Sequence, residues 1–349
     1  MLEFRTAGFN PYSVKYSPFY DNRLCVAAGA NFGLVGNGRL YILSLTANGP
    51  VCERYFETQD CLFDTCWSEA HENQVLTAGG DGSIKLFDIA LPDAQFPVAQ
   101  WKEHGREVFS VNWNLGHKNT FLSSSWDGTV KIWDPQGSDM SLSTLPIHSC
   151  VYSAQFSPHN PEMITAVSRD SHLRIFDLRT PASASNHLTL AIPIHAPPKR
   201  MPGVTMPVAG AMGPTECLTH DWNKYRDTIV ATAGVDGAIR VFDIRNPGAG
   251  PISVLGGHDY AVKKVAWSPH LSDVLLSASY DMTCRVWTDG SATGVGGAGM
   301  GGKELGRMEG HTEFAMGADW CLFGAEGWCA TCAWDERVLI WDVREFMRS

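Results

Sequence analysis

The chain lacks the features that would assign it to a membrane, a secretory route or a nucleic acid. Its 349 residues contain no apolar run of 18 residues and no Asn-x-Ser/Thr acceptor, and residues 1–9 (MLEFRTAGF) have neither region of a signal peptide. Lysine and arginine (27) are outnumbered by aspartate and glutamate (37), so the formal net charge is −10. This balance argues against nucleic acid and favours a basic ligand. We expect a soluble intracellular protein that does not insert into membranes.

Disulfide bonds and metal sites are not expected either, although the chain has ten cysteines. Most of those examined fall inside predicted strands, where a free cysteine behaves as a small hydrophobe (Cys25, Cys66, Cys284, Cys321 and Cys329). The motif Cys329-Ala-Thr-Cys332 has no second cysteine pair, and residues three apart in a strand point to opposite faces. We predict no metal and no cofactor.

A pattern of three short strands recurs along the chain. Its clearest copy is residues 104–134, in which apolar runs of period two are separated by turn residues, and this pattern predicts antiparallel strands. A turn aspartate stands seven residues before a strand-ending aspartate in five copies: Asp81/Asp88, Asp127/Asp134, Asp170/Asp177, Asp236/Asp243 and Asp335/Asp342. Asp281 keeps the turn, but its strand ends in Trp287-Thr288. A degenerate first copy fits residues 11–45, which makes seven copies.

The spacing of the copies predicts the fold. The turn aspartates lie 46, 43, 66, 45 and 54 residues apart, and a unit of about 40–45 residues with a Trp-Asp ending is typical of a WD-repeat β-propeller. We predict one all-β, seven-bladed propeller over residues 1–349, closed by an N-terminal strand (Leu2–Thr6) in the last blade. Val51–Thr58 is the expected outer strand of the first blade. Irregular inserts are expected near residues 181–214, with an outer strand near 187–194, and near 289–302.

Three sets of polar residues could be mistaken for catalytic sites. They are His104, Asp127 and Trp133 with one of Ser123–Ser125; His258, Asp281 and Trp287 with Ser277 or Ser279; and His311, Thr331, Asp335 and Trp341. Similarity to WD-repeat proteins implies that the aspartate accepts a hydrogen bond from the histidine and that the Ser or Thr hydroxyl connects the histidine to the indole N–H of the tryptophan by hydrogen bonds. A catalytic set would occur once, so we predict structural tetrads and no enzyme. Gly297-x4-Gly302-Lys303 is followed by Glu304 rather than Ser or Thr, which argues against a phosphate loop.

The rim of the central channel is the expected binding site. Loops entering the inner strands and turns between the second and third strands share this rim. Alignment of the copies places large apolar residues and acids there: Cys61, Phe63, Phe109, Trp126, Tyr280, Phe314 and Trp334, with Glu107, Glu216 and, near them, Asp64. These rings could simply plug the channel. Together with the acids, however, they suit an amphipathic helix that carries Arg or Lys.

Five stretches exceed the general WD-repeat pattern. They resemble the peroxisomal import receptors for the type 2 targeting signal: residues 61–69, 102–111, 125–135, 156–161 and 311–314. The resemblance implies a receptor that shuttles between cytoplasm and peroxisome. It also implies binding of an N-terminal cargo helix (thiolase being the usual cargo), a co-receptor polypeptide and a peroxisomal docking complex. Glu107 and Glu216, then Asp64, would pair the cations, and the aromatic residues would contact cargo or co-receptor. A generic WD-repeat scaffold is the alternative.

Overall fold

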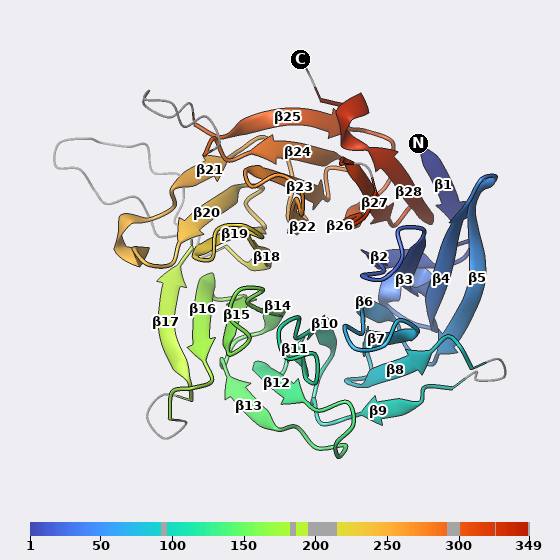
Figure 1. The fold of residues 1–349 in the computed structure, drawn as a ribbon, viewed down its shortest axis with the longest axis horizontal. Helices are drawn as coiled ribbons and strands as arrows, with labels where there is room; N and C mark the ends of the chain where they lie inside the picture. Colours follow the sequence, from blue (N-terminus) through green and yellow to red (C-terminus); the bar gives the residue numbers. More distant parts are fainter. Residues whose placement is uncertain (92–95, 182–185, 195–214, 292–300, 325, 348–349) are drawn as a thin grey trace.

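The computed structural model describes residues 1–91, 96–181, 186–194, 215–291, 301–324 and 326–347. Seven four-stranded antiparallel sheets stand around a central channel (Figure 1), which confirms the predicted propeller. We call these sheets blades 1 to 7 and give the strands of each blade from the channel outwards. Blades 1 to 3 are β2 (Asn10–Tyr16), β3 (Arg23–Gly29), β4 (Gly38–Thr46) and β5 (Gly49–Thr58); β6 (Leu62–Trp67), β7 (Gln74–Gly79), β8 (Ile84–Asp88) and β9 (Ala99–Trp101); and β10 (Val108–Trp113), β11 (Phe121–Ser125), β12 (Thr129–Trp133) and β13 (Ser143–Pro146).

Blades 4 to 7 repeat the same order. They are β14 (Val151–Phe156), β15 (Met163–Ser168), β16 (His172–Asp177) and β17 (Leu188–Pro193); β18 (Cys217–Trp222), β19 (Ile229–Gly234), β20 (Ile239–Asp243) and β21 (Ser253–Leu255); β22 (Val262–Trp267), β23 (Val274–Ser279), β24 (Cys284–Thr288) and β25 (Lys303–Met308); and β26 (Ala315–Trp320), β27 (Trp328–Ala333), β28 (Arg337–Asp342) and β1 (Leu2–Arg5). In the described part of the chain, short 3-10 helices lie between β3 and β4 (η1, Ala30–Gly33), between β20 and β21 (η2, Pro247–Ala249) and after β28 (η3, Val343–Glu345).

The first strand of the chain completes the last blade. β1 pairs antiparallel with β28, with Leu2 opposite Ile340 and Arg5 opposite Arg337, and the N–H of Thr6 donates to the carbonyl of Glu336. This pairing covers the outer edge of blade 7 and joins the two ends of the chain (Figure 1). The predicted closure is therefore confirmed, although the strand ends at Arg5.

The predicted outer strands are also present. β5 contains the expected segment 51–58, and β17 lies within 187–194. Of the two predicted inserts, residues 182–185, 195–214 and 292–300 lie outside the described part of the chain, and so does Gly297. Glu304, which argued against a phosphate loop, lies in β25 and accepts a hydrogen bond from Arg285.

The hydrophobic core lies between neighbouring blades. One cluster joins Leu76 of β7 to Trp113, Phe121 and Trp133 of blade 3, and comparable clusters fill the other junctions. Middle strands such as β11 and β23 are buried on both faces because a blade packs on each side of them. Stability therefore depends on every blade having its neighbours.

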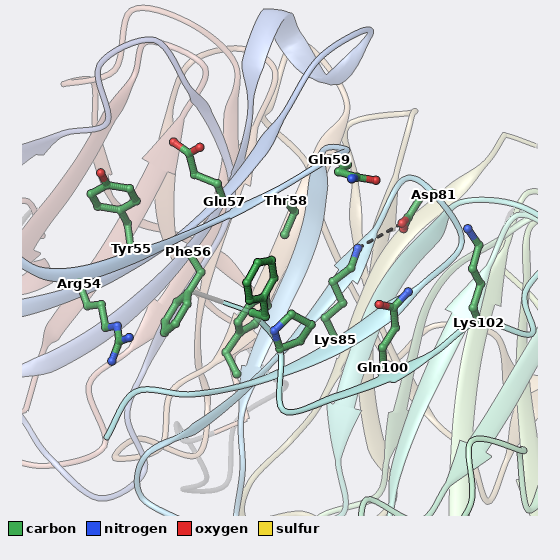
Figure 2. Close-up of a pocket in the computed structure, with 13 residues that line it drawn as sticks. Arg54, Tyr55, Phe56, Glu57, Thr58, Gln59, Asp81, Lys85, Gln100 and Lys102 are labelled. Carbon is green, nitrogen blue, oxygen red and sulfur yellow. Dashed lines mark hydrogen bonds and ion pairs between the residues drawn. The ribbon is translucent and has the colours of Figure 1, made fainter. Parts of the chain in front are cut away.

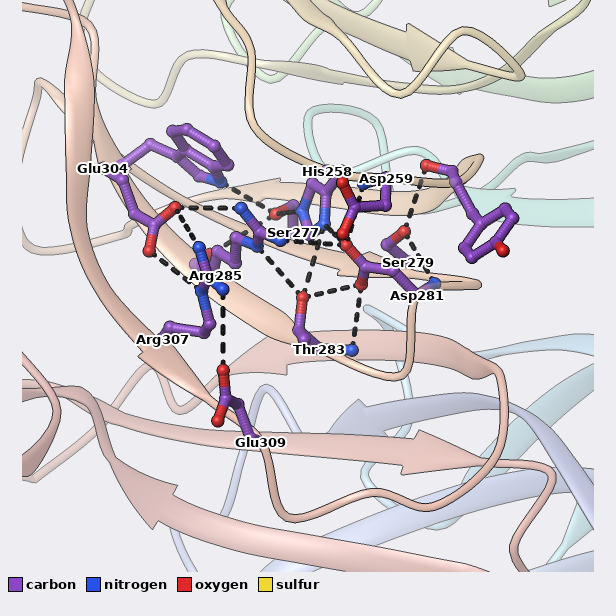
Figure 3. A network of polar contacts seen from close by, with 12 residues as sticks. His258, Asp259, Ser277, Ser279, Asp281, Thr283, Arg285, Glu304, Arg307 and Glu309 are labelled. Carbon is purple, nitrogen blue, oxygen red and sulfur yellow. Dashed lines mark hydrogen bonds and ion pairs between the residues drawn. The ribbon is translucent and has the colours of Figure 1, made fainter.

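The three polar tetrads are built as hydrogen-bonded relays. In blade 6, His258 Nδ1 lies 2.7 Å from Asp281 Oδ2 and Nε2 lies 2.7 Å from Ser277 Oγ, which accepts from Trp287 Nε1 at 2.8 Å (Figure 3). Of the alternatives left open, Ser277 rather than Ser279 completes the relay. The same contacts link His104, Asp127, Ser123 and Trp133 in blade 3 and His311, Asp335, Thr331 and Trp341 in blade 7. The hydroxyls are fully buried and engaged on both sides.

Candidate functional site

A cavity of about 990 Å³ opens at one end of the channel, and we call it the mouth. All seven blades contribute side chains to it. The lining residues are Tyr12, Phe32, Leu34, Phe63, Glu107, Phe109, Trp126, Tyr152, Glu216, Leu218, Val235, Asp259, Tyr260, Lys263, Tyr280, Met282, Phe314, Met316 and Trp334, with Gly33 and Ala261. Eight of the ten residues predicted for ligand binding lie in this set.

The aromatic residues of the mouth form one continuous arc. Phe63 stacks on Phe109 (4.6 Å between ring centroids), and Phe109 stacks on Trp126 (4.5 Å). On the other side, Tyr280 stacks on Phe314 (4.8 Å), which contacts Trp334 (5.4 Å). The buried ring of Tyr12 joins both groups edge-on, at 5.2 Å from Phe63 and 5.6 Å from Trp334. The rings support one another yet stay half-buried, apart from Tyr12, so the arc is a surface and not only a plug.

Contacts with neighbouring rings hold the indoles of the two tryptophans at the turns, and the Arg106 guanidinium lies 5.3 Å from the ring centroid of Trp126. The indole nitrogens of Trp126 and Trp334 are buried and have no hydrogen-bond partner among the described residues. In the tetrads, by contrast, each tryptophan donates to a hydroxyl. An unpaired indole N–H lowers stability, but the core residue Trp267 has one as well, so the half-buried rings, and not this N–H, distinguish the two positions.

Two carboxylates lie beside the arc and keep about a third of their side chains exposed. Glu107 (34% exposed) has Arg106 as an ion-pair partner at 3.4 Å, and Glu216 (32%) has Arg169 at 3.0 Å and accepts from the hydroxyl of Tyr152. Burial, and then this hydrogen bond, raise the pKa of Tyr152. Both arginines are more than half exposed, and such pairs contribute little stability. A cation on a ligand can therefore replace either arginine.

The structure places Asp64 outside the mouth, so its predicted position beside Glu107 and Glu216 is wrong. Its carboxylate is buried in the channel wall, where it accepts from Ser13 Oγ at 2.7 Å and from the N–H of Val111 at 3.2 Å. The pairing of β6 shifts register between Leu62 and Asp64. Phe63 therefore faces the mouth, and Asp64 ties blade 2 to blades 1 and 3.

Cys61 is also absent from the lining of the mouth. It is 1% exposed and packs with Tyr12 and Met316 beneath the aromatic arc. Its thiol is free, and burial raises its pKa. Cys61 supports the floor of the site, where a ligand does not reach it.

Sequence reasoning missed part of the mouth. Residues 30–36, which we call the lip, bring Phe32 and Leu34 to its edge. The available signal was the run Phe32-Gly-Leu-Val-Gly36, which places apolar residues where the other copies carry a polar turn. Lys263, which alignment of the copies places at the rim, lines the mouth as expected. Its Nζ lies 5.5 Å from the ring centroid of Phe109, and burial, then the nearby Lys264, lower its pKa to about 8.

Other candidate sites are weaker. A peripheral cavity of about 760 Å³ between blades 1 and 2 is lined by Arg54, Glu57, Lys85 and their neighbours (Figure 2), but Lys85 is paired with Asp81 and Glu57 with Arg39. Cys329 and Cys332 pack into clusters on opposite sides of β27, as expected. No group of His, Cys, Asp and Glu in the described residues has a metal-binding arrangement, and no helix among them is long and apolar enough to cross a membrane.

The repeated blades and the mouth define a WD-repeat propeller with a cavity at one end of its channel. The model of the family "WD domain, G-beta repeat" matches residues 95–134, 140–177 and 249–288. The peroxisomal targeting signal 2 receptor of Saccharomyces cerevisiae is 41% identical over 394 aligned residues, covering 98% of this chain and 99% of its own. Peroxisome biogenesis protein 7 of Arabidopsis thaliana is 40% identical (96% of each chain), and the human targeting signal 2 receptor is 36% identical (90% of this chain, 86% of its own). The chain belongs to the family of peroxisomal targeting signal 2 receptors, which confirms the resemblance drawn from its motifs.

Proposed function

We propose that this chain is a receptor that binds the type 2 peroxisomal targeting signal as a basic amphipathic helix in the mouth. The observation that carries the proposal is the arc of half-buried rings, from Tyr280 to Trp126, beside two partly exposed carboxylates. Rings receive an apolar stripe, and carboxylates pair with Arg or Lys. Relatives over nearly the full length are named for this signal.

Binding follows from the chemistry of the two parts of the site. The net charge of −10 draws a basic peptide toward the protein. At the mouth, Glu107 and Glu216 exchange the exposed guanidinium groups of Arg106 and Arg169 for the cations of the ligand. The aromatic arc then removes the apolar stripe of the helix from water, which provides most of the binding free energy.

The proposal extends to the partners of the receptor. A co-receptor polypeptide covers the bound helix, cargo is a thiolase-like matrix protein, and the complex meets a docking complex at the peroxisome. The receptor moves between the cytoplasm and the peroxisome. No cofactor takes part, and nucleic acid is not a ligand.

Binding of a labelled synthetic peptide tests the proposal. The peptide is a basic amphipathic helix with one essential Arg, and its anisotropy is followed with the purified chain, alone and together with the co-receptor. We expect saturable binding that is lost when Arg is replaced by Ala. Binding that ignores the Arg, or no binding under both conditions, favours a generic WD-repeat scaffold. In cells, deletion of the chain should leave thiolase in the cytoplasm.

A further inference from the structure

The lip has an unusual backbone. Asn31 (φ 49°), Phe32 (φ 56°) and Gly33 (φ 67°) adopt left-handed conformations one after another. This region is easily reached by glycine but is strained for an aromatic residue such as Phe32. Strained conformations persist where the surroundings impose them, and they concentrate at functional sites.

Hydrogen bonds from the inner strand of blade 1 fix this conformation. The N–H of Phe32 donates to Asn10 Oδ1 at 2.8 Å, and the hydroxyl of Tyr12 donates to the carbonyl of Phe32 at 2.6 Å. Asn31 Nδ2 donates to the carbonyl of Val35 at 3.0 Å, and the ring of Phe32 packs edge-on against Trp334 at 5.5 Å. The lip is therefore a shaped continuation of the aromatic arc.

The lip presents apolar side chains to solvent. Leu34 is 83% exposed and Val35 is 75% exposed, and Phe32 beneath them is 49% exposed. Three neighbouring apolar residues held away from the core at the edge of a ligand cavity mark an interaction surface. A loop that served only to connect β3 with β4 would not need them.

The charges of the mouth indicate which part of a ligand meets the lip. Its acidic residues come from blades 3, 5 and 6 (Glu107, Glu216 and Asp259), whereas blades 7, 1 and 2 contribute only uncharged residues. Blade 1 faces blades 4 and 5 across the channel (Figure 1). The charged side chains of the mouth, these three acids and Lys263 of blade 6, thus lie on one side and uncharged side chains on the other, where the lip forms the edge.

We propose that the lip is the wall against which the apolar face of the targeting helix packs, so that the helix lies with its cations over blades 3 and 5 and its apolar stripe toward blade 1. This inference rests on the proposed function and adds the orientation of the ligand and a contact surface to it. An amphipathic helix has these two faces on opposite sides, as the mouth does.

The test compares Leu34→Ser with Leu142→Ser, a leucine that is 62% exposed on the segment leading to the outer strand of blade 3. The probe is the fluorescein-labelled basic amphipathic peptide, under the conditions in which the unmodified chain binds it. We expect Leu34→Ser to weaken binding by about tenfold, as for the loss of one buried leucine side chain, and Leu142→Ser to leave it unchanged. Both variants should melt at the temperature of the parent protein.

Peptide variants identify the contacting face. An apolar-face Leu→Ala change in the peptide should be non-additive with Leu34→Ser, while the Arg→Ala change should be additive with it. Two results overturn the proposed orientation while leaving the receptor function intact. In one, Leu34→Ser is non-additive with the Arg→Ala change in the peptide instead of the Leu→Ala change. In the other, Leu34→Ser binds the peptide as tightly as the parent chain does and loses only its affinity for the co-receptor. Failure of the parent chain to bind the peptide at all removes the proposed function, and this inference with it.

Discussion

The carboxylate of Asp319 accepts the backbone N–H of Tyr16 at 2.9 Å, across the junction where blade 7 meets blade 1. The same contact recurs around the ring, since a side chain on one inner strand accepts an N–H from the inner strand of the next blade. The other pairs, acceptor first, are Asp64 with Val111 (3.2 Å), Ser110 with Ala154 (3.1 Å), Asn112 with Phe156 (2.9 Å), Thr219 with Val265 (3.3 Å) and Asp221 with Trp267 (2.7 Å). Inner strands have no sheet partner on the channel side, so these contacts satisfy their backbone and hold the blades together.

Removal of Asp319 should therefore destabilise the propeller. Asp319 also pairs with Lys15 Nζ at 3.0 Å, and although burial lowers the pKa of Lys15, this carboxylate raises it above its ordinary value. Asp319→Ala leaves an amide and a largely buried ammonium without their partner, so we expect a loss of about 3 kcal/mol in the free energy of unfolding. Urea denaturation measures it.

Two further variants separate the contributions at this junction. The double variant Lys15→Met/Asp319→Asn keeps an acceptor for the N–H of Tyr16 and removes both charges. It should therefore be more stable than Asp319→Ala. Glu57→Ala, which removes a carboxylate that is 52% exposed, should change stability by less than about 1 kcal/mol. Equal losses for Asp319→Ala and Glu57→Ala would contradict the closure role.

The fold was predictable because each copy repeats its local signals. The aspartate of the tight turn, the histidine before the inner strand and the tryptophan of the third strand recur at similar spacings, and each forms the same contacts in blades 3, 6 and 7. The alternating apolar residues of each copy predicted its strands. The N-terminal strand was predictable because the last copy lacked an outer strand.

The site was only partly predictable because side-chain direction depends on features that spacing does not contain. Phe63 lines the mouth, whereas the neighbouring Asp64 is buried in the channel wall, although the sequence places both near the rim. The left-handed backbone of the lip leaves no regular signature in the sequence. A relay between blades 4 and 5 was missed as well. Thr165 Oγ1 lies 2.8 Å from His220 Nε2 and accepts a hydrogen bond from Trp222 Nε1 at 2.9 Å, and Thr165 precedes these two residues by 55 and 57 positions.

Asp281 should make the free energy of unfolding depend on pH in the acidic range. Burial alone would raise its pKa, but hydrogen bonds from His258 and Thr283 hold the pKa well below the ordinary value of 3.8. The ionised carboxylate therefore stabilises the fold above about pH 4, and this contribution is lost as the pH falls below that value. We expect Asp281→Asn to lower the free energy of unfolding by about 3 kcal/mol at pH 7 and by less at pH 3. Asp139→Asn, at an exposed position, should show no such trend.

Glu107→Lys should abolish binding of the basic peptide without unfolding the protein. The side chain is 34% exposed and its partner is a single exposed arginine, so its replacement leaves no buried group unpaired. The melting temperature should shift by less than about 2 °C. Glu162→Lys makes the same charge change at a similarly exposed position (35%), in the turn between β14 and β15 at the other end of the ring. Peptide anisotropy should separate the two variants clearly.

The affinity of the parent chain should also fall modestly as salt is raised, because the carboxylates are screened while the aromatic arc is not. An affinity that does not change with salt would remove the role given to the acids. A large drop in the melting temperature of Glu107→Lys would instead make Glu107 a structural residue.

Lys263 is the one position in the mouth where replacement of a charge should stabilise the fold. Its ammonium lies over Phe109 and has no carboxylate partner among the described residues, and burial, then Lys264, lower its pKa to about 8. Between pH 8 and 10.5 the unfolded chain keeps this proton while the folded chain has released it, so stability rises with pH across that interval. Below pH 8 the full penalty of this half-buried charge is present. Lys263→Met should therefore be more stable than the parent at pH 7, by roughly 1–2 kcal/mol, with an advantage that shrinks toward pH 10.5.

The difference between variant and parent is the quantity to measure, by urea denaturation at several pH values from 7 to 10.5. Tyr12 and Tyr280 line the same mouth, and burial raises the pKa of both, so their ionisation in the unfolded chain lowers stability at high pH in parent and variant alike. The subtraction removes this shared effect. Lys303→Met, at an exposed position in β25, should give a flat difference near zero. A flat difference for Lys263→Met as well would mean that its ammonium is as well solvated in the folded protein as in the unfolded chain, and that burial in the mouth does not lower its pKa.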